Sequence, residues 1–264
     1  MVNTLPTKFP PVGRCIYCLR SSGPLSDEHI IAYGLNGTAV LPDASCPACA
    51  EVTSELERRF LRGPAYAMRG HFGFKSRKGL PNKFPVYVTK NGVSKKLNLR
   101  VDQYPLVLPL PIFSNMVPAY MENRVADTIK AEKTVLISLI PGVGPGDLLV
   151  RAKKFLNVDS LELPTLDVMS FGRMILKSAY ALTVATHGLD SVKDPIAVPV
   201  ILERKHDLGT FLGSTPDVSH DQEGEHITRV QKFARPGEEV AVVMIKLFGT
   251  LPAPIYVAVT ARMK

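Results

Sequence analysis

The sequence predicts an α+β fold, in which a small cysteine-bearing module over residues 1–80 precedes a larger α+β domain over residues 81–264 with a β-rich C-terminus. Three observations predict this fold. All four cysteines lie between Cys15 and Cys49, in two C-x-x-C pairs. Apolar residues at helical spacing follow the second pair. From residue 226 onward, apolar runs alternate with turn residues, which is typical of antiparallel strands.

The bulk composition excludes several classes of protein. The chain has 264 residues and is 45% hydrophobic, which is enough for a sizeable core, and its 21% of charged residues argues against wholesale disorder. No run of 18 apolar residues occurs, so no membrane span or membrane partner is expected. The N-terminus lacks the apolar core of a signal peptide. We therefore expect a cytoplasmic protein, whose thiols stay reduced.

The two cysteine pairs, Cys15/Cys18 and Cys46/Cys49, predict a metal site. Each pair can form a tight turn that points both sulfurs at one ion, and two such turns give the closed tetrahedral S4 shell that zinc prefers. Two disulfides are the alternative, which a reducing compartment disfavours, and a redox C-x-x-C would be expected only once. A closed shell has no open position. The predicted Zn²⁺ is therefore structural, and it holds a segment too small for a core of its own.

The stretch around these cysteines predicts short elements. Val52, Leu56 and Phe60 form one apolar stripe, which predicts a helix from about Cys49 to Leu61, ended by a Gly-Pro pair. Upstream, "HIIAY" predicts a short strand and "GLNGTAVLPDAS" predicts a loop.

Between the cysteine pairs lies an acid-histidine pair, Glu28-His29, within "EHII". Taken with the cysteine spacing, the glycine-bearing loop and the helix that starts at the last cysteine, this arrangement resembles the zinc-stapled HNH endonucleases, whose core is the ββα-metal finger. The resemblance covers about residues 15–79. Further on, "FGRMILKSAYALTVATHG" resembles, less specifically, a helix found in the C-terminal region of some members.

The resemblance implies hydrolysis of a phosphodiester bond, with one divalent ion, Mg²⁺ or Mn²⁺, on the scissile phosphate. By position, His29 matches the general base and Glu28 matches the acid that binds the catalytic ion. Asp43 matches the asparagine that orients the histidine. Ala50 stands where the family usually has an Asn or His ligand, and the neighbouring Glu51 could supply an oxygen donor to the ion instead.

A basic segment follows the cysteines. From Arg58 to Arg100 the chain has twelve Lys and Arg and no Asp or Glu, whereas the remainder holds all 24 acids. Aromatic residues interleave with these cations: Phe60, Tyr66, Phe72, Phe74, Phe84 and Tyr87. This pattern predicts a surface for a polyanion, and a basic surface without a partner is the alternative. The predicted nucleic-acid contacts are Arg58, Arg59, Arg62, Arg69, Lys75, Arg77 and Lys78.

The rest of the chain predicts structure but no chemistry. Asn91-Gly92 predicts a hairpin turn, and the proline-rich stretch from Pro105 to Pro118 predicts a linker or an irregular crossing. A helix is expected from Ser170 to Thr186. Three strands are expected near the C-terminus, the first two joined at Pro236-Gly237.

These observations favour a metal-dependent HNH endonuclease acting on DNA, which could work as a homodimer. The alternative is a catalytically degenerate HNH finger that binds nucleic acid or a protein without cutting. A zinc-stapled structural protein with no nucleic-acid role is a third hypothesis. Ala50 favours the second hypothesis, whereas Glu28-His29 and the basic segment favour the first.

Overall fold

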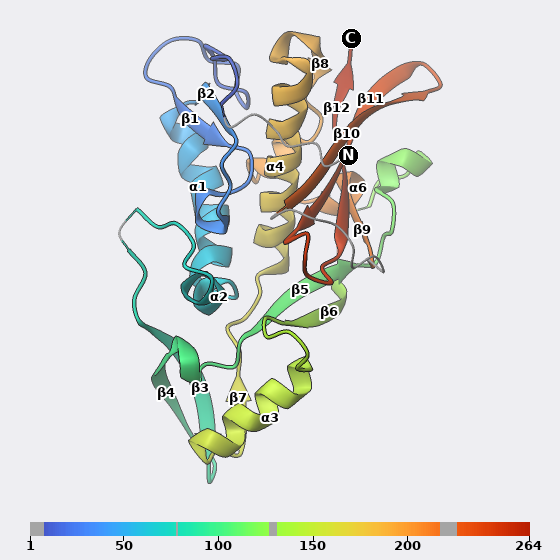
Figure 1. The fold of residues 1–264 in the computed structure, drawn as a ribbon. Helices are drawn as coiled ribbons and strands as arrows, with labels where there is room; N and C mark the ends of the chain where they lie inside the picture. The colour runs from blue at the N-terminus through green and yellow to red at the C-terminus, as the bar shows by residue number, and fades with distance from the viewer. Residues whose placement is uncertain (1–7, 78, 127–130, 217–225) are drawn as a thin grey trace.

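The computed structural model of the protein describes residues 8–77, 79–126, 131–216 and 226–264. It contains both helices and sheets, and its C-terminal part is rich in strands, which confirms the predicted α+β class (Figure 1). In the described part of the chain, no helix is both long and apolar enough to cross a membrane.

The cysteine-bearing module has the order strand, strand, helix. β1 (Ser26–His29) pairs antiparallel with β2 (Val40–Ser45), and α1 (Pro47–Arg62) follows at once. The first strand was predicted three residues too late, and the second lies inside the predicted loop. Pro42 and Asp43 within β2 are poor strand formers, and they are tolerated because β1 is the one strand that pairs with β2 among the described residues.

The predicted helix is confirmed, with slightly wider bounds. α1 begins with Pro47 in its first turn, where the missing N–H costs nothing, and ends before Gly63. Leu56 and Phe60 of its apolar stripe are buried. A short helix, α2 (Tyr66–His71), comes next.

The second half of the basic segment forms a small sheet. The hairpin of β3 (Lys83–Lys90) and β4 (Val93–Arg100) confirms the predicted turn, since Asn91 and Gly92 both have the positive φ of a type I′ turn. β7 (Ser160–Glu162) completes this sheet in the order β4-β3-β7, and α3 (Pro145–Leu156) precedes it in the chain.

The proline-rich stretch is a strand, so the linker prediction for it is wrong. β5 (Val107–Phe113) pairs antiparallel with β6 (Ala131–Ser138). Pro109 and Pro111 lie two residues apart in β5, which has a single strand partner in this two-stranded sheet. Proline is compatible with such an edge position, because its missing N–H need not face a partner.

The helix α4 (Val168–His187) lies at the centre of the molecule, between α1 and the C-terminal sheet (Figure 1). Asp167 caps it by accepting a hydrogen bond from the Ser170 amide. Buried residues from both sides of residue 80 form one core around α4. The sheet contains β10 (His226–Arg235), β11 (Glu238–Leu247), β12 (Ile255–Met263), β8 (Val192–Asp194) and β9 (Leu212–Thr215).

Short helices complete the connections. The α-helical ones are α5 (Val198–Ile201) and α6 (Leu208–Phe211). The 3₁₀ helices are η1 (Tyr33–Leu35), η2 (Val101–Gln103), η3 (Ala119–Glu122) and η4 (Leu189–Ser191).

Candidate functional site: a four-cysteine centre beside a basic cavity

The four cysteines meet at one point, as predicted. Their sulfur atoms all lie within 4.8 Å of one another, and Cys18 Sγ is 3.5 Å from Cys46 Sγ. None forms a disulfide. A tetrahedral zinc ion with bonds of about 2.3 Å would hold its sulfurs about 3.8 Å apart, so the cluster has the right size for a metal ion.

Backbone hydrogen bonds shape the two turns that carry the sulfurs. In the first turn, the Cys15 amide donates to Arg20 O at 2.8 Å, and Leu19 has a φ of +62°. The second turn is the start of α1, where Cys46 is the N-cap residue. The Ile16 amide donates to Ala44 O at 2.8 Å and joins the two turns. The described residues contain no other group of three or more Cys, His, Asp and Glu side chains this close together.

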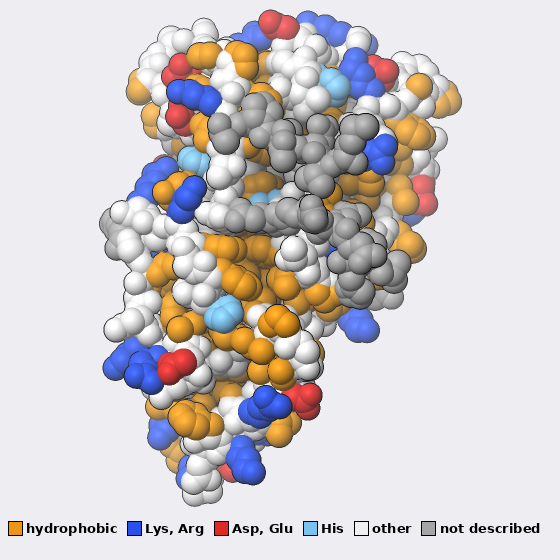
Figure 2. All heavy atoms as spheres, viewed as in Figure 1, with side chains coloured by type: hydrophobic (Ala, Val, Ile, Leu, Met, Phe, Trp, Pro, Cys, Tyr) orange, Lys and Arg blue, Asp and Glu red, His pale blue; other side chains and the backbone are white. Residues whose placement is uncertain are grey.

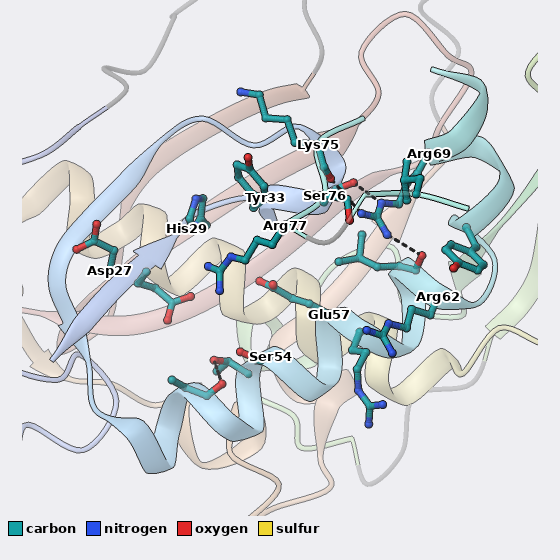
Figure 3. A pocket seen from close by; sticks show the side chains of 18 of the residues that line it. Asp27, His29, Tyr33, Ser54, Glu57, Arg62, Arg69, Lys75, Ser76 and Arg77 are labelled. Carbon is teal, nitrogen blue, oxygen red and sulfur yellow. Dashed lines mark hydrogen bonds between the residues drawn. The ribbon is translucent and has the colours of Figure 1, made fainter. Parts of the chain in front are cut away.

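A cavity of about 700 Å³ lies beside this centre, between β1, α1, α2 and the segment after α2 (Figure 3). On that side of the molecule, Figure 2 shows Lys and Arg side chains with hydrophobic side chains among them. Seven of the predicted catalytic, ion-binding or nucleic-acid-binding residues line the cavity. They are Glu28, His29, Arg58, Arg62, Arg69, Lys75 and Arg77.

An ion-pair triad lies at the floor of the cavity, where Glu28 and Glu57 line it and Lys177 joins their carboxylates from behind. Lys177 of α4 places its Nζ 2.5 Å from Glu28 Oε1 and 2.7 Å from Glu57 Oε1, and it donates a hydrogen bond to His29 O at 2.5 Å. The Lys177 side chain is 1% exposed. Burial opposes its charge, but the two carboxylates outweigh burial and raise the Lys177 pKa above its ordinary value. The ammonium is therefore charged at neutral pH.

The same buried environment raises the pKa of Glu28 and lowers the pKa of His29. Burial raises the pKa of Glu28, and Lys177 counteracts part of that rise. Burial lowers the pKa of His29, with further lowering by the Lys177 and Arg77 charges. The His29 ring packs edge-on against Tyr33, with centroids 5.4 Å apart. His29 is therefore neutral at pH 7 and can accept a proton.

The cations that line the cavity differ in their freedom to bind a ligand. Arg69 is buried and donates to three backbone carbonyls, those of Gly34, Leu61 and Lys75, so its guanidinium holds the wall together. A Cβ at Gly34 would lie 2.9 Å from Leu61 Cδ1 and 3.0 Å from the Arg69 guanidinium, so these two side-chain ends would have to shift to admit it. Arg62 and Arg77 are exposed and form no ion pair with any residue that the structure describes.

Arg58 and Arg59 have acidic partners on or near α1. The Arg58 Nε donates to Glu55 at 2.7 Å, and Arg59 contacts both Glu55 and Asp167 at 3.1 Å. Arg58 lines the cavity, whereas Arg59 does not. Lys78 lies outside the described residues.

Two further predicted residues lie away from the cavity lining. Asp43 is exposed in β2, with a φ of +49°, and Glu51 is exposed on α1.

Two residues of the site, Glu57 and Lys177, were not predicted from the sequence. A helical repeat could have found Glu57, because Ala50, Ser54 and Glu57 lie on one face of α1 and all line the cavity.

The described residues do not form a dedicated site for the Mg²⁺ or Mn²⁺ that the resemblance implies. Outside the cysteines, no three ligating side chains come together in the described chain. Ala50 has no donor atom in its side chain, and Lys177 already binds the carboxylates of both Glu28 and Glu57. The cavity offers cations and one neutral imidazole instead, which together suit an anionic ligand.

Comparison with known proteins gives no relative. No protein-family model, no curated protein and no solved structure matches this chain. The functional argument therefore depends on the geometry of the site.

Proposed function

We propose that this chain is a nuclease of the ββα type, which binds a nucleic-acid backbone in the basic cavity and hydrolyses a phosphodiester bond, with DNA as its substrate. One observation carries the proposal: the neutral His29 stands at a cavity whose exposed cations, Arg62 and Arg77, have no acidic partner in the described chain. The four cysteines would hold a structural Zn²⁺ that keeps β1 and α1 in place.

The proposed step uses the chain's own residues. A ring nitrogen of His29 accepts the proton of a water molecule as its oxygen attacks phosphorus. The bond from phosphorus to the leaving oxygen breaks, and that oxygen takes a proton from solvent. Arg62 and Arg77 stabilise the charge that builds up on the phosphoryl oxygens. Lys177 keeps His29 in position through its backbone carbonyl.

Alanine at His29 is expected to abolish cleavage while leaving binding intact. General bases contribute about 10²–10⁴-fold to rate, so nicking of supercoiled plasmid should fall by that factor. Because the His29 pKa lies below its usual value, the wild-type rate should rise with pH only in the acid range and stay level above about pH 6.5. An H29A variant that nicks plasmid as fast as wild type would disprove the assignment.

The ion requirement is measured in the same assay, with Mg²⁺, Mn²⁺ or EDTA, and with the zinc content checked afterwards. Cleavage that stops in EDTA while zinc is retained would show that substrate phosphate and cavity together hold the ion implied by the resemblance. Cleavage that continues would show that the side chains suffice.

Binding without cleavage is the second candidate function. The alanine at position 50 favours it, as does the Lys177 ammonium on the carboxylates that an ion would need. In that case wild type and H29A would both shift DNA on a gel, and neither would cut.

Both candidates predict how single arginine substitutions act on DNA affinity. Arg62→Ala and Arg77→Ala should each weaken binding and lower the salt dependence by about one unit of slope, since each removes one phosphate contact. Arg59→Ala is the matched control, because Arg59 is an α1 arginine that does not line the cavity and contacts Glu55 and Asp167. Anisotropy titrations at several salt concentrations provide the comparison. Equal effects of all three substitutions would place the binding surface elsewhere.

A further inference from the structure

A row of aromatic rings leads from the core to the surface beside the basic cavity. Phe248 is buried, with 5% of it exposed, and its ring stacks on Phe74 at 6.3 Å and 21°. Phe74 stacks in turn on Phe72 at 5.6 Å and 25°. Phe72 is 43% exposed, although it is a large apolar side chain. The row therefore ends at the Phe72 ring, which stacks on Phe74 on its inner side and is partly exposed to solvent.

Two cations of the cavity lie on the same segment of chain as these rings, and a third, Arg62, lies across from them on α1. Phe72 and Phe74 are followed by Lys75 and Arg77, which line the cavity. Figure 3 shows the Lys75 and Arg77 side chains on this segment, with Arg77 pointing toward the cavity between His29 and Glu57. Five residues of extended chain span at most about 17 Å, a length that roughly five nucleotides cover along a strand.

From this arrangement we infer that the ligand is a single strand, with one unpaired base stacked on Phe72 while the neighbouring phosphates contact Lys75, Arg77 and Arg62. This inference rests on the proposed function and names its substrate class. Proteins that bind single strands combine a cationic groove with exposed aromatic rings, since every base has a flat face that can stack. A duplex cannot use Phe72 without unstacking a base, which costs a few kcal/mol.

The test compares single-stranded and duplex DNA of equal length by fluorescence anisotropy. Phe72→Leu keeps an apolar side chain but removes the ring. It should weaken binding of the single strand by about 5- to 150-fold and leave duplex binding unchanged. Phe72→Tyr should bind like wild type. The matched control is Phe233→Leu, because Phe233 is 51% exposed and does not line the basic cavity.

A second readout reports stacking itself. A single strand that carries 2-aminopurine should lose fluorescence when it binds wild type and regain it with Phe72→Leu. If Phe72→Leu binds the single strand and quenches its fluorescence as strongly as Phe233→Leu does, the inference is overturned. If Arg62→Ala and Arg77→Ala still weaken binding in that case, the proposed function survives without it. If they too bind like wild type, both proposals fail. Thermal unfolding of each variant confirms that the fold is intact.

Discussion

Serine in place of Cys18 is expected to release the Zn²⁺ proposed for the four-cysteine centre and to unfold the N-terminal module. A structural zinc site contributes an apparent binding free energy of roughly 10–16 kcal/mol, which is as large as the whole stability of an ordinary domain. The sheet of β1 and β2 has two strands, and the turns that carry the sulfurs depend on the ion for their geometry, although Ile16 and Leu56 pack into the core around α4. Metal content by mass spectrometry should fall from one zinc per chain to none, and limited proteolysis should cut within residues 15–62.

The choice of Cys18 separates metal binding from core packing. Cys18 is exposed, whereas Cys15, Cys46 and Cys49 are buried. If the thiols merely filled space, Cys18→Ser would cost little and Cys46→Ser would cost much. If all four bind one ion, both substitutions should release it. A Cys18→Ser protein that keeps its metal and resists protease would contradict the four-cysteine centre.

Elements with a strong local signal could be predicted from sequence. α1 shows an apolar stripe of helical period, and the Asn91-Gly92 pair fits the type I′ turn that its hairpin adopts. The four cysteines also gave a correct prediction, because two C-x-x-C turns leave little choice of geometry. In each case, the signal lies within a few consecutive residues.

Elements that depend on distant partners could not be predicted. β2 and β5 contain prolines and read as loops, yet pairing with one neighbouring strand makes them extended. The contact between Lys177 and Glu57 was not predicted for the same reason, since the two residues lie 120 positions apart in the chain. The sequence shows that α4 is a helix but not which of its side chains will face α1.

Methionine in place of Lys177 is the second substitution expected to have a large effect. It keeps the length of the side chain but leaves the buried Glu28 and the partly buried Glu57 without their cation, and breaking a buried ion pair costs about 3–5 kcal/mol. Chemical denaturation would measure the loss in free energy of unfolding. Lys154→Met is the control, because Lys154 is an exposed helical lysine, and its substitution should change stability by less than about 0.5 kcal/mol.

The pH dependence identifies the cause of that loss. Burial already raises the pKa of Glu28, and removal of Lys177 takes away the charge that counteracts the rise. An acid whose pKa is higher in the folded state than in the unfolded state destabilises the fold as pH rises above the unfolded value of about 4.3. The deficit of Lys177→Met against wild type should therefore shrink as the pH is lowered toward that value.

Neutral partners should rescue the variant if charge is the cause. In a chain that carries Glu28→Gln and Glu57→Gln, the Lys177→Met substitution should cost much less, because no buried carboxylate is left unpaired. An equal cost in both backgrounds would mean that Lys177 acts through packing. The rescued triple variant also bears on the proposed mechanism. If it folds yet loses activity that the Glu28→Gln/Glu57→Gln double variant retains, the hydrogen bond from Lys177 to His29 O is what positions the base, since the two variants differ only at Lys177.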